Sequence, residues 1–208
     1  MKVHTKESQS KLTPSTALQI LEEGNRRFMS NSKINRDLLE QVNGTKKGQF
    51  PFAIVLSCID SRVPVELIFD QGIGHIFNVK IAGNFVNEDI LGSMEFACKV
   101  AGSKLIVVLG HSSCGAVKGA CDDVKLGNLT SLLSKIKPAI NLVEETGERS
   151  SANAEYVQNV ADKNVEVAIE QIKLLSPILN EMLKEKEIDI VGGMYSVDTG
   201  EVVFSNNN

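Results

Sequence analysis

Phe52-Ala53-Ile54-Val55-Leu56 and Leu105-Ile106-Val107-Val108-Leu109 are two short apolar runs, and each is followed within two residues by chemically active side chains. Runs of this length that are rich in β-branched residues predict buried strands. The first leads into Cys58-Ile59-Asp60-Ser61-Arg62 and the second into His111-Ser112-Ser113-Cys114. In open α/β sheets, sites form where strands end. Neighbouring positions for these two strands would therefore bring thiols, an imidazole and a carboxylate together.

Two Cys, one His and a carboxylate or water form a ligand set that suits Zn²⁺. His111 and Cys114 are three residues apart and can reach one ion from a single turn. Asp60 lies two residues after Cys58, so it can approach the same ion. Arg62 can hold a carboxylate through a bidentate pair. We therefore predict a metal site, although four cysteines can in principle also form two disulfides.

Taken singly, these residue types have ordinary structural explanations. A lone Cys is more often a small core residue than a ligand, which suits Cys98 and Cys121. We interpret His4 and His75 as structural or solvated side chains. Asp60 and Arg62 can also form a surface ion pair of little energetic value. The metal site is favoured only because the candidates gather at two strand ends.

Composition excludes several classes of partner. The chain has 208 residues, enough for a sizeable core, and its net charge of −4 gives no electrostatic reason to bind nucleic acid or an anionic membrane. No apolar run approaches the roughly 20 residues of a membrane helix. The polar start of the chain lacks the apolar segment of a signal peptide. We therefore expect a cytoplasmic protein whose thiols stay reduced.

Strand-like and helix-like segments alternate along the chain, which predicts an α/β fold with a mostly parallel central sheet flanked by helices. We expect one domain over residues 1–208, with an extended N-terminal helical arm at 1–48 and an α/β core at 49–208. The predicted strands are 52–57, 75–81, 104–109, 188–194 and 201–204. The predicted helices are 14–29, 64–69, 89–100, 116–124, 129–143, 154–175 and 177–186.

Three positions leave local alternatives open. Thr13 is the expected N-cap of the first helix, ahead of Pro14, and Ser15 is the alternative. Gly24 weakens the middle of that helix and can interrupt it. Pro138 should kink or split the helix predicted at 129–143.

The chain resembles the β-class carbonic anhydrases at three stretches, residues 58–63, 82–84 (Ala-Gly-Asn) and 110–117. The likeness extends to residues 24–28 and to Gln49. The paired CxDxR and HxxCG motifs are highly specific at this spacing.

That resemblance implies a zinc lyase in which Cys58, His111 and Cys114 are the permanent ligands of Zn²⁺. Water, hydroxide or Asp60 would take the fourth position. The implied reaction is the reversible hydration of carbon dioxide to bicarbonate and a proton, by attack of zinc-bound hydroxide. Asp60 and Arg62 would act as a pair. Arg62 holds Asp60 away from an open metal, or Asp60 swings onto the zinc and turns the enzyme off.

The resemblance also assigns a substrate pocket. Gln49 would hydrogen-bond substrate, Phe77, Ala82 and Phe96 would line a narrow apolar pocket, and the backbone N–H of Gly115 would lie near the metal. Ordinary core packing is an equally good explanation for both Phe residues.

The same resemblance implies an assembly of several copies. A homodimer or homotetramer is expected, with the active site at the subunit interface. The first helix would then reach across a neighbour, but its apolar stripe would equally serve a core within one chain.

Two rival functions stay open at this stage. One is a zinc hydrolase of CS₂ or COS on the same fold, because tunnel shape rather than motif sets the substrate. The other is a catalytically silent zinc-binding homologue, against which the complete Asp60–Arg62 pair argues.

We predict that the rate of carbon dioxide hydration rises toward alkaline pH. Two thiolates donate more charge to zinc than neutral imidazoles do, so the metal should acidify its water less strongly. A stopped-flow pH profile checks this, and a flat profile from about pH 6 to 9 would count against it.

Overall fold

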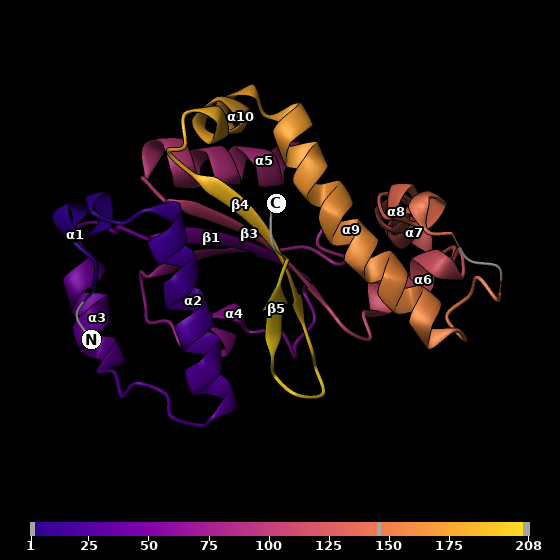
Figure 1. Ribbon diagram of the computed structural model, residues 1–208, viewed down its shortest axis with the longest axis horizontal. Helices are drawn as coiled ribbons and strands as arrows, with labels where there is room; N and C mark the ends of the chain where they lie inside the picture. Colours follow the sequence, from indigo (N-terminus) through magenta and orange to yellow (C-terminus); the bar gives the residue numbers. More distant parts are fainter. Residues whose placement is uncertain (1–2, 145–146, 206–208) are drawn as a thin grey trace.

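The computed structural model describes residues 3–144 and 147–205. A five-stranded sheet lies at its centre, between helices (Figure 1). The strand order is β2-β1-β3-β4-β5, in which the first four strands run parallel and β5 pairs antiparallel with β4. The predicted α/β fold with a mostly parallel sheet is therefore confirmed. The strands are β1 (Ala53–Ser57), β2 (Ile76–Lys80), β3 (Leu105–His111), β4 (Asp189–Tyr195) and β5 (Val202–Phe204).

The register between β1 and β3 sets the position of the site. Ser57, the last residue of β1, pairs with Leu109 of β3, so Cys58 lies beside the last residues of β3. Every residue of β1 and β3 is buried, because both faces of the sheet are covered. Side chains alternate between the faces. Ile54 and Leu56 belong to one apolar cluster, and Ala53 and Val55 belong to another.

Helices cover the sheet on both sides (Figure 1). On one face, α2 (Pro14–Met29) and α4 (Val65–Ile68) pack over β1 and β3. The other face carries α5 (Glu88–Glu95), its π-helical continuation η1 (Phe96–Val100), α9 (Ala154–Leu175) and α10 (Pro177–Lys184). No described helix combines the length and apolarity needed to cross a bilayer.

A third group of helices lies beyond the carboxyl ends of the strands. It consists of α6 (Gly115–Cys121), α7 (Gly127–Ser134) and α8 (Lys137–Leu142). Their apolar cluster includes Cys58, Cys114 and Ile136. Pro138 stands in the first turn of α8, where its missing N–H costs nothing. The predicted split at this proline is therefore confirmed.

The N-terminal helices pack on their own chain. Ala17 and Leu21 of α2 join the same apolar cluster as Val55 and Val107 of the sheet, so the apolar stripe of this helix serves an intrachain core. Sequence patterns had not indicated α1 (Lys6–Ser10), although Thr5 and Ser8 form a capping box at its start. The third N-terminal helix is α3 (Leu38–Thr45), whose N-cap Asp37 accepts from the backbone N–H of Glu40.

Gly24 does not interrupt α2, which runs unbroken from its N-cap Thr13. A Cβ at Gly24 would lie 1.8 Å from the carbonyl oxygen of Phe69, so only glycine lets the helix approach α4 this closely. The next residue, Asn25, is buried and donates to the carbonyls of Ile68 and Gly200. Gly24 is therefore the point at which α2 contacts the end of α4.

We predict that Gly24→Ala lowers the free energy of unfolding by about 1–3 kcal/mol or more, because backbone atoms of α4 must move to admit the methyl group. Urea unfolding measures the change. The matched control is Gly92→Ala in α5, where a Cβ would meet no atom of the described part of the single chain within 4 Å. That variant should be stabilised by about 0.5–1 kcal/mol through helix propensity. Equal effects of the two substitutions would contradict the close approach at Gly24.

Candidate metal centre

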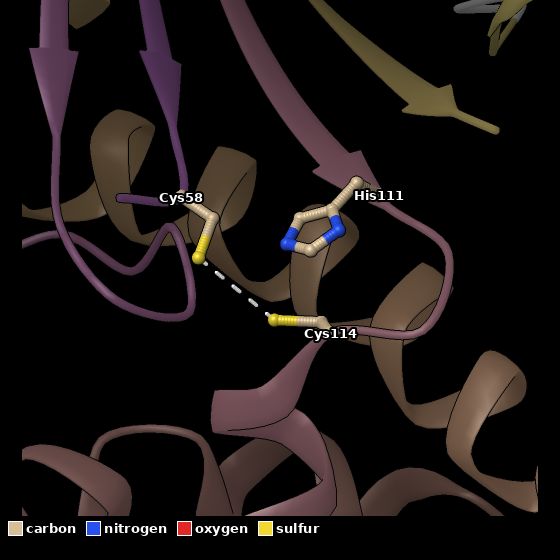
Figure 2. Close-up of side chains that lie close together, drawn as sticks. All are labelled: Cys58, His111 and Cys114. Atoms are coloured by element: carbon tan, nitrogen blue, oxygen red, sulfur yellow. Dashed lines mark hydrogen bonds between the residues drawn. The ribbon is translucent and has the colours of Figure 1, made fainter. Parts of the chain in front are cut away.

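Cys58, His111 and Cys114 converge at the carboxyl edge of the sheet (Figure 2). Cys58 follows β1 directly, His111 is the last residue of β3, and Cys114 is the N-cap of α6. Their candidate ligand atoms all lie within 4.8 Å of one another, and the three side chains are at most 4% exposed. The structure thus brings together the three residues that we predicted as metal ligands.

The imidazole of His111 has the tautomer that a metal ligand needs. Its Nδ1 lies 2.9 Å from the carbonyl oxygen of Ser112, which can only accept, so Nδ1 carries the proton. Its Nε2 therefore keeps a free lone pair, and it is buried without a hydrogen-bond partner among the residues that the structure describes. A buried polar atom left unpaired is costly. A cation bound to Nε2 removes that cost.

The two sulfur atoms lie 3.9 Å apart, and the thiol of Cys114 donates to Cys58. This hydrogen bond, together with a weaker one from the backbone N–H of Gly83, lowers the pKa of Cys58 to about 4. The pKa of Cys114 is raised, first because its proton is held by Cys58 and then because of burial. The pair therefore shares one proton, which a cation would displace on binding.

Two sulfur atoms and one imidazole nitrogen form three protein ligands, which leaves a fourth tetrahedral position open. This donor set and the unpaired Nε2 of His111 fit a divalent transition-metal ion.

Asp60 lies beside the ligands and is held by Arg62. The Arg62 side chain donates to both carboxylate oxygens, from Nε to Oδ1 at 2.9 Å and from Nη2 to Oδ2 at 2.7 Å. These bonds hold the pKa of Asp60 well below its usual range. Asp60 Oδ2 is 3.9 Å from His111 Nε2, and Arg62 also donates to the carbonyl of Ser113 at 3.3 Å. The pair thus joins the two loops that carry the ligands and is more than a surface ion pair.

A mostly apolar cavity of about 290 Å³ adjoins the ligands. Two of the five predicted substrate-binding residues, Ala82 and Gly115, line it. Sequence reasoning missed Leu129 and Leu133, which also line the cavity and were assigned only to a predicted helix. The remaining lining residues are Cys58, Ile59, Asp60, Ala116 and Gly119.

The other three predicted substrate-binding residues lie elsewhere in this single chain. Phe77 and Phe96 pack edge to face, 6.2 Å between ring centroids, and line a separate cavity of about 630 Å³ beside β2. Gln49 is exposed in the segment that precedes β1. A contribution of these residues to the metal-proximal cavity would need a second copy of the chain, and it stays a prediction.

The remaining cysteines and histidines lie apart from the centre. Cys98 is buried in the apolar cluster of α5 and α9, where burial raises its pKa to about 12. Cys121 is partly buried in α6, and all four cysteines are free thiols. His75 is fully buried, with its ring 5.3 Å from that of His4.

The family model described as carbonic anhydrase matches residues 53–202, which include every residue of the centre. The chain belongs to the carbonic anhydrase family.

Individual relatives and solved structures support the same family assignment. The chain is 32% identical over 197 residues to carbonic anhydrase 2 of Mycobacterium tuberculosis, covering 92% of each protein. It is 32% identical over 195 residues to a carbonic anhydrase of Mycolicibacterium smegmatis, covering 91% of this chain and 92% of that protein. Among solved structures, the β-carbonic anhydrase CcaA superposes with a TM-score of 0.69 at 25% identity, covering 92% of this chain and 88% of that one. The fold and the family thus belong to the β class.

We predict that Arg62→Gln raises the pKa of Asp60 toward the ordinary carboxyl value of about 3.9. The pKa of Asp60 is depressed in the folded protein. The ion pair therefore stabilises the fold at pH values above the ordinary carboxyl pKa, and this stabilisation is lost as the pH falls toward the pKa that Asp60 has in the folded protein. The stability difference between wild type and variant should therefore exist at neutral pH and vanish in strong acid. It should be small, because the Arg62 side chain is 49% exposed.

An NMR titration of the Asp60 carboxyl carbon in metal-free protein measures the pKa, and urea unfolding at neutral and acid pH measures the stability. The control is Lys125→Gln, which removes a partner of the surface residue Asp123. An unchanged Asp60 pKa in Arg62→Gln would refute the pairing.

Proposed function

We propose that this protein catalyses the zinc-dependent, reversible hydration of carbon dioxide to bicarbonate and a proton. The observation that carries the proposal is the convergence of Cys58, His111 and Cys114, with an unpaired nitrogen on His111, beside an Asp60–Arg62 pair. Membership of the β-class carbonic anhydrases supports the same reaction.

Zinc held by Cys58, His111 and Cys114 supplies Lewis acidity, which lowers the pKa of a coordinated water far below that of bulk water, as is established for carbonic anhydrases. The rest of the chemistry depends on the side chains around the ligands. The Ser112 carbonyl accepts from Nδ1 of His111 and thereby fixes the orientation of its ring.

Asp60 orients the reacting water in this proposal. Because Arg62 keeps its carboxylate ionised, Asp60 can accept a hydrogen bond but cannot donate one at neutral pH. The accepted hydrogen bond directs an oxygen lone pair toward the carbon of the substrate. Because Arg62 holds both oxygens of the Asp60 carboxylate, Asp60 would leave room beside the three ligand side chains for a water molecule.

The adjoining cavity suits a small apolar substrate. Ala82, Leu129 and Leu133 contribute hydrocarbon surface next to the ligands. Carbon dioxide carries no charge and has little need of hydrogen bonds, whereas bicarbonate is a solvated anion. An apolar wall therefore favours entry of the gas and release of the product.

We predict that Cys58→Ala lowers zinc content and abolishes carbon dioxide hydration. The loss should exceed about 100-fold, because even a partner of a ligand costs about 10–100-fold when removed. Stopped-flow hydration assays on protein of measured zinc content test this. Cys98→Ala is the matched control, since Cys98 is equally buried but lies in a different cluster.

One zinc per chain in the wild type without activity at any pH would contradict the proposed reaction. Assays with COS and CS₂ would then test the rival hydrolase.

We further propose that the enzyme works as a homo-oligomer in the cytoplasm. The proposal is supported by β2, which is the edge strand of the sheet and whose described ladder partner is β1. The neighbouring Phe96 and Val100 are 52% and 72% exposed. A second copy on this edge would bury both side chains. Free thiols as metal ligands suit a reducing compartment.

We predict that Phe96→Asp shifts the protein toward monomers, because a charge at the centre of an apolar interface is costly to bury. Size-exclusion chromatography with light scattering measures the mass. Leu142→Asp is the control, since Leu142 is 60% exposed at the end of α8, away from β2. A wild-type protein that is already monomeric would refute the oligomer.

A further inference from the structure

Asn164 is a buried amide on the apolar face of α9. Its side chain belongs to a residue that is only 2% exposed, and the neighbouring buried positions of the helix are Ala161, Val165 and Ala168. Burying an amide among apolar side chains is unfavourable unless its hydrogen bonds are made. The contact that Asn164 makes therefore indicates what it does.

That contact is with the loop that follows β2. Asn164 Nδ2 donates to the carbonyl oxygen of Gly83 at 2.8 Å, and the backbone N–H of Gly83 donates to Cys58 Sγ at 3.5 Å. The two hydrogen bonds flank the same α-carbon. A chain of contacts thus runs from α9 through one glycine to a metal ligand.

Gly83 needs an external restraint. Its φ of +80° lies in the left-handed region, and a Cβ would lie 2.6 Å from Ile136 Cδ1, so no other residue fits without displacing that side chain. Glycine has the largest conformational freedom to lose on folding. The next residue, Asn84, also has a positive φ, of 38°. The loop is held by the Asn84 N–H, which donates to the carbonyl of Ile81 at 3.0 Å, and a bond to the Gly83 carbonyl adds a restraint beside the N–H that faces the sulfur.

We propose that Asn164 is a positioning residue for the metal centre. It fixes the carbonyl of Gly83, so that the Gly83 N–H stays directed at the Cys58 sulfur. The inference rests on the metal site of the proposed function and adds to it a residue that lies 50 positions from the nearest ligand, Cys114, in the sequence. An N–H···S hydrogen bond orients a thiolate ligand and reduces the charge that it gives to the metal. Such outer partners typically change metal affinity by about 10–100-fold.

The test is zinc affinity, measured by competition with a chromophoric chelator. Asn164→Ala removes the donor, and Asn164→Leu removes it while keeping the volume of the side chain. Both variants should bind zinc about 10-fold more weakly than wild type. In the cobalt-substituted proteins, the sulfur-to-cobalt charge-transfer band should shift, because the Cys58 sulfur has lost its donor.

Ile172→Ala is the matched control for a purely structural effect. Ile172 is fully buried on the same helix, eight residues or about 12 Å further along its axis. It should lose stability in urea unfolding, yet bind zinc like wild type with an unshifted cobalt band.

Wild-type zinc affinity and an unshifted cobalt band in Asn164→Leu would overturn the proposal. An equal loss of affinity in Ile172→Ala would do the same, since weaker binding would then follow from general destabilisation. A wild-type protein that binds no zinc would overturn the proposed function itself, and this inference with it.

Discussion

The parallel pairing of β1 with β3 is the constraint on which the rest of the site depends. With Ser57 opposite Leu109, the two strands deliver Cys58 and His111 to the same edge of the sheet from positions more than 50 residues apart. The strands are buried on both faces, so a slip of one residue would exchange the side chains that pack in the two apolar clusters. The packing of the hydrophobic core thus sets the positions of the ligands before any metal binds.

The metal centre combines a backbone held by the sheet with buried polar atoms that lack hydrogen-bond partners or share a proton. His111 Nε2 is buried without a partner, and two thiols share one proton. Such an arrangement is costly for the protein alone and becomes favourable when a cation occupies it. The Asp60–Arg62 pair works in the opposite sense, because it is already complete without a metal. One part of the site is therefore built to receive an ion, and the other to keep a carboxylate ready beside it.

Two glycines occupy positions where a side chain would disturb the packing. Gly24 brings α2 within contact of the Phe69 carbonyl, and Gly83 places a backbone N–H at the Cys58 sulfur. A side chain at either position would meet atoms closer than van der Waals contact. Gly24, which weakens the first helix as a local signal, is a packing requirement once the partner segment is in place.

The sequence by itself determined the fold class, the positions of the strands along the chain and the candidates for the metal site. Apolar periodicity and the spacing of Cys, His and Asp are local properties. It also placed Thr13 as a cap and Pro138 as a break. Only the tertiary structure decided that α2 packs on its own chain and that Leu129 and Leu133 line the cavity. It likewise separated Phe77 and Phe96 from the ligands of the same chain. Those outcomes depend on which surfaces meet after the sheet has formed, and contacts between residues distant in sequence leave no periodic signal.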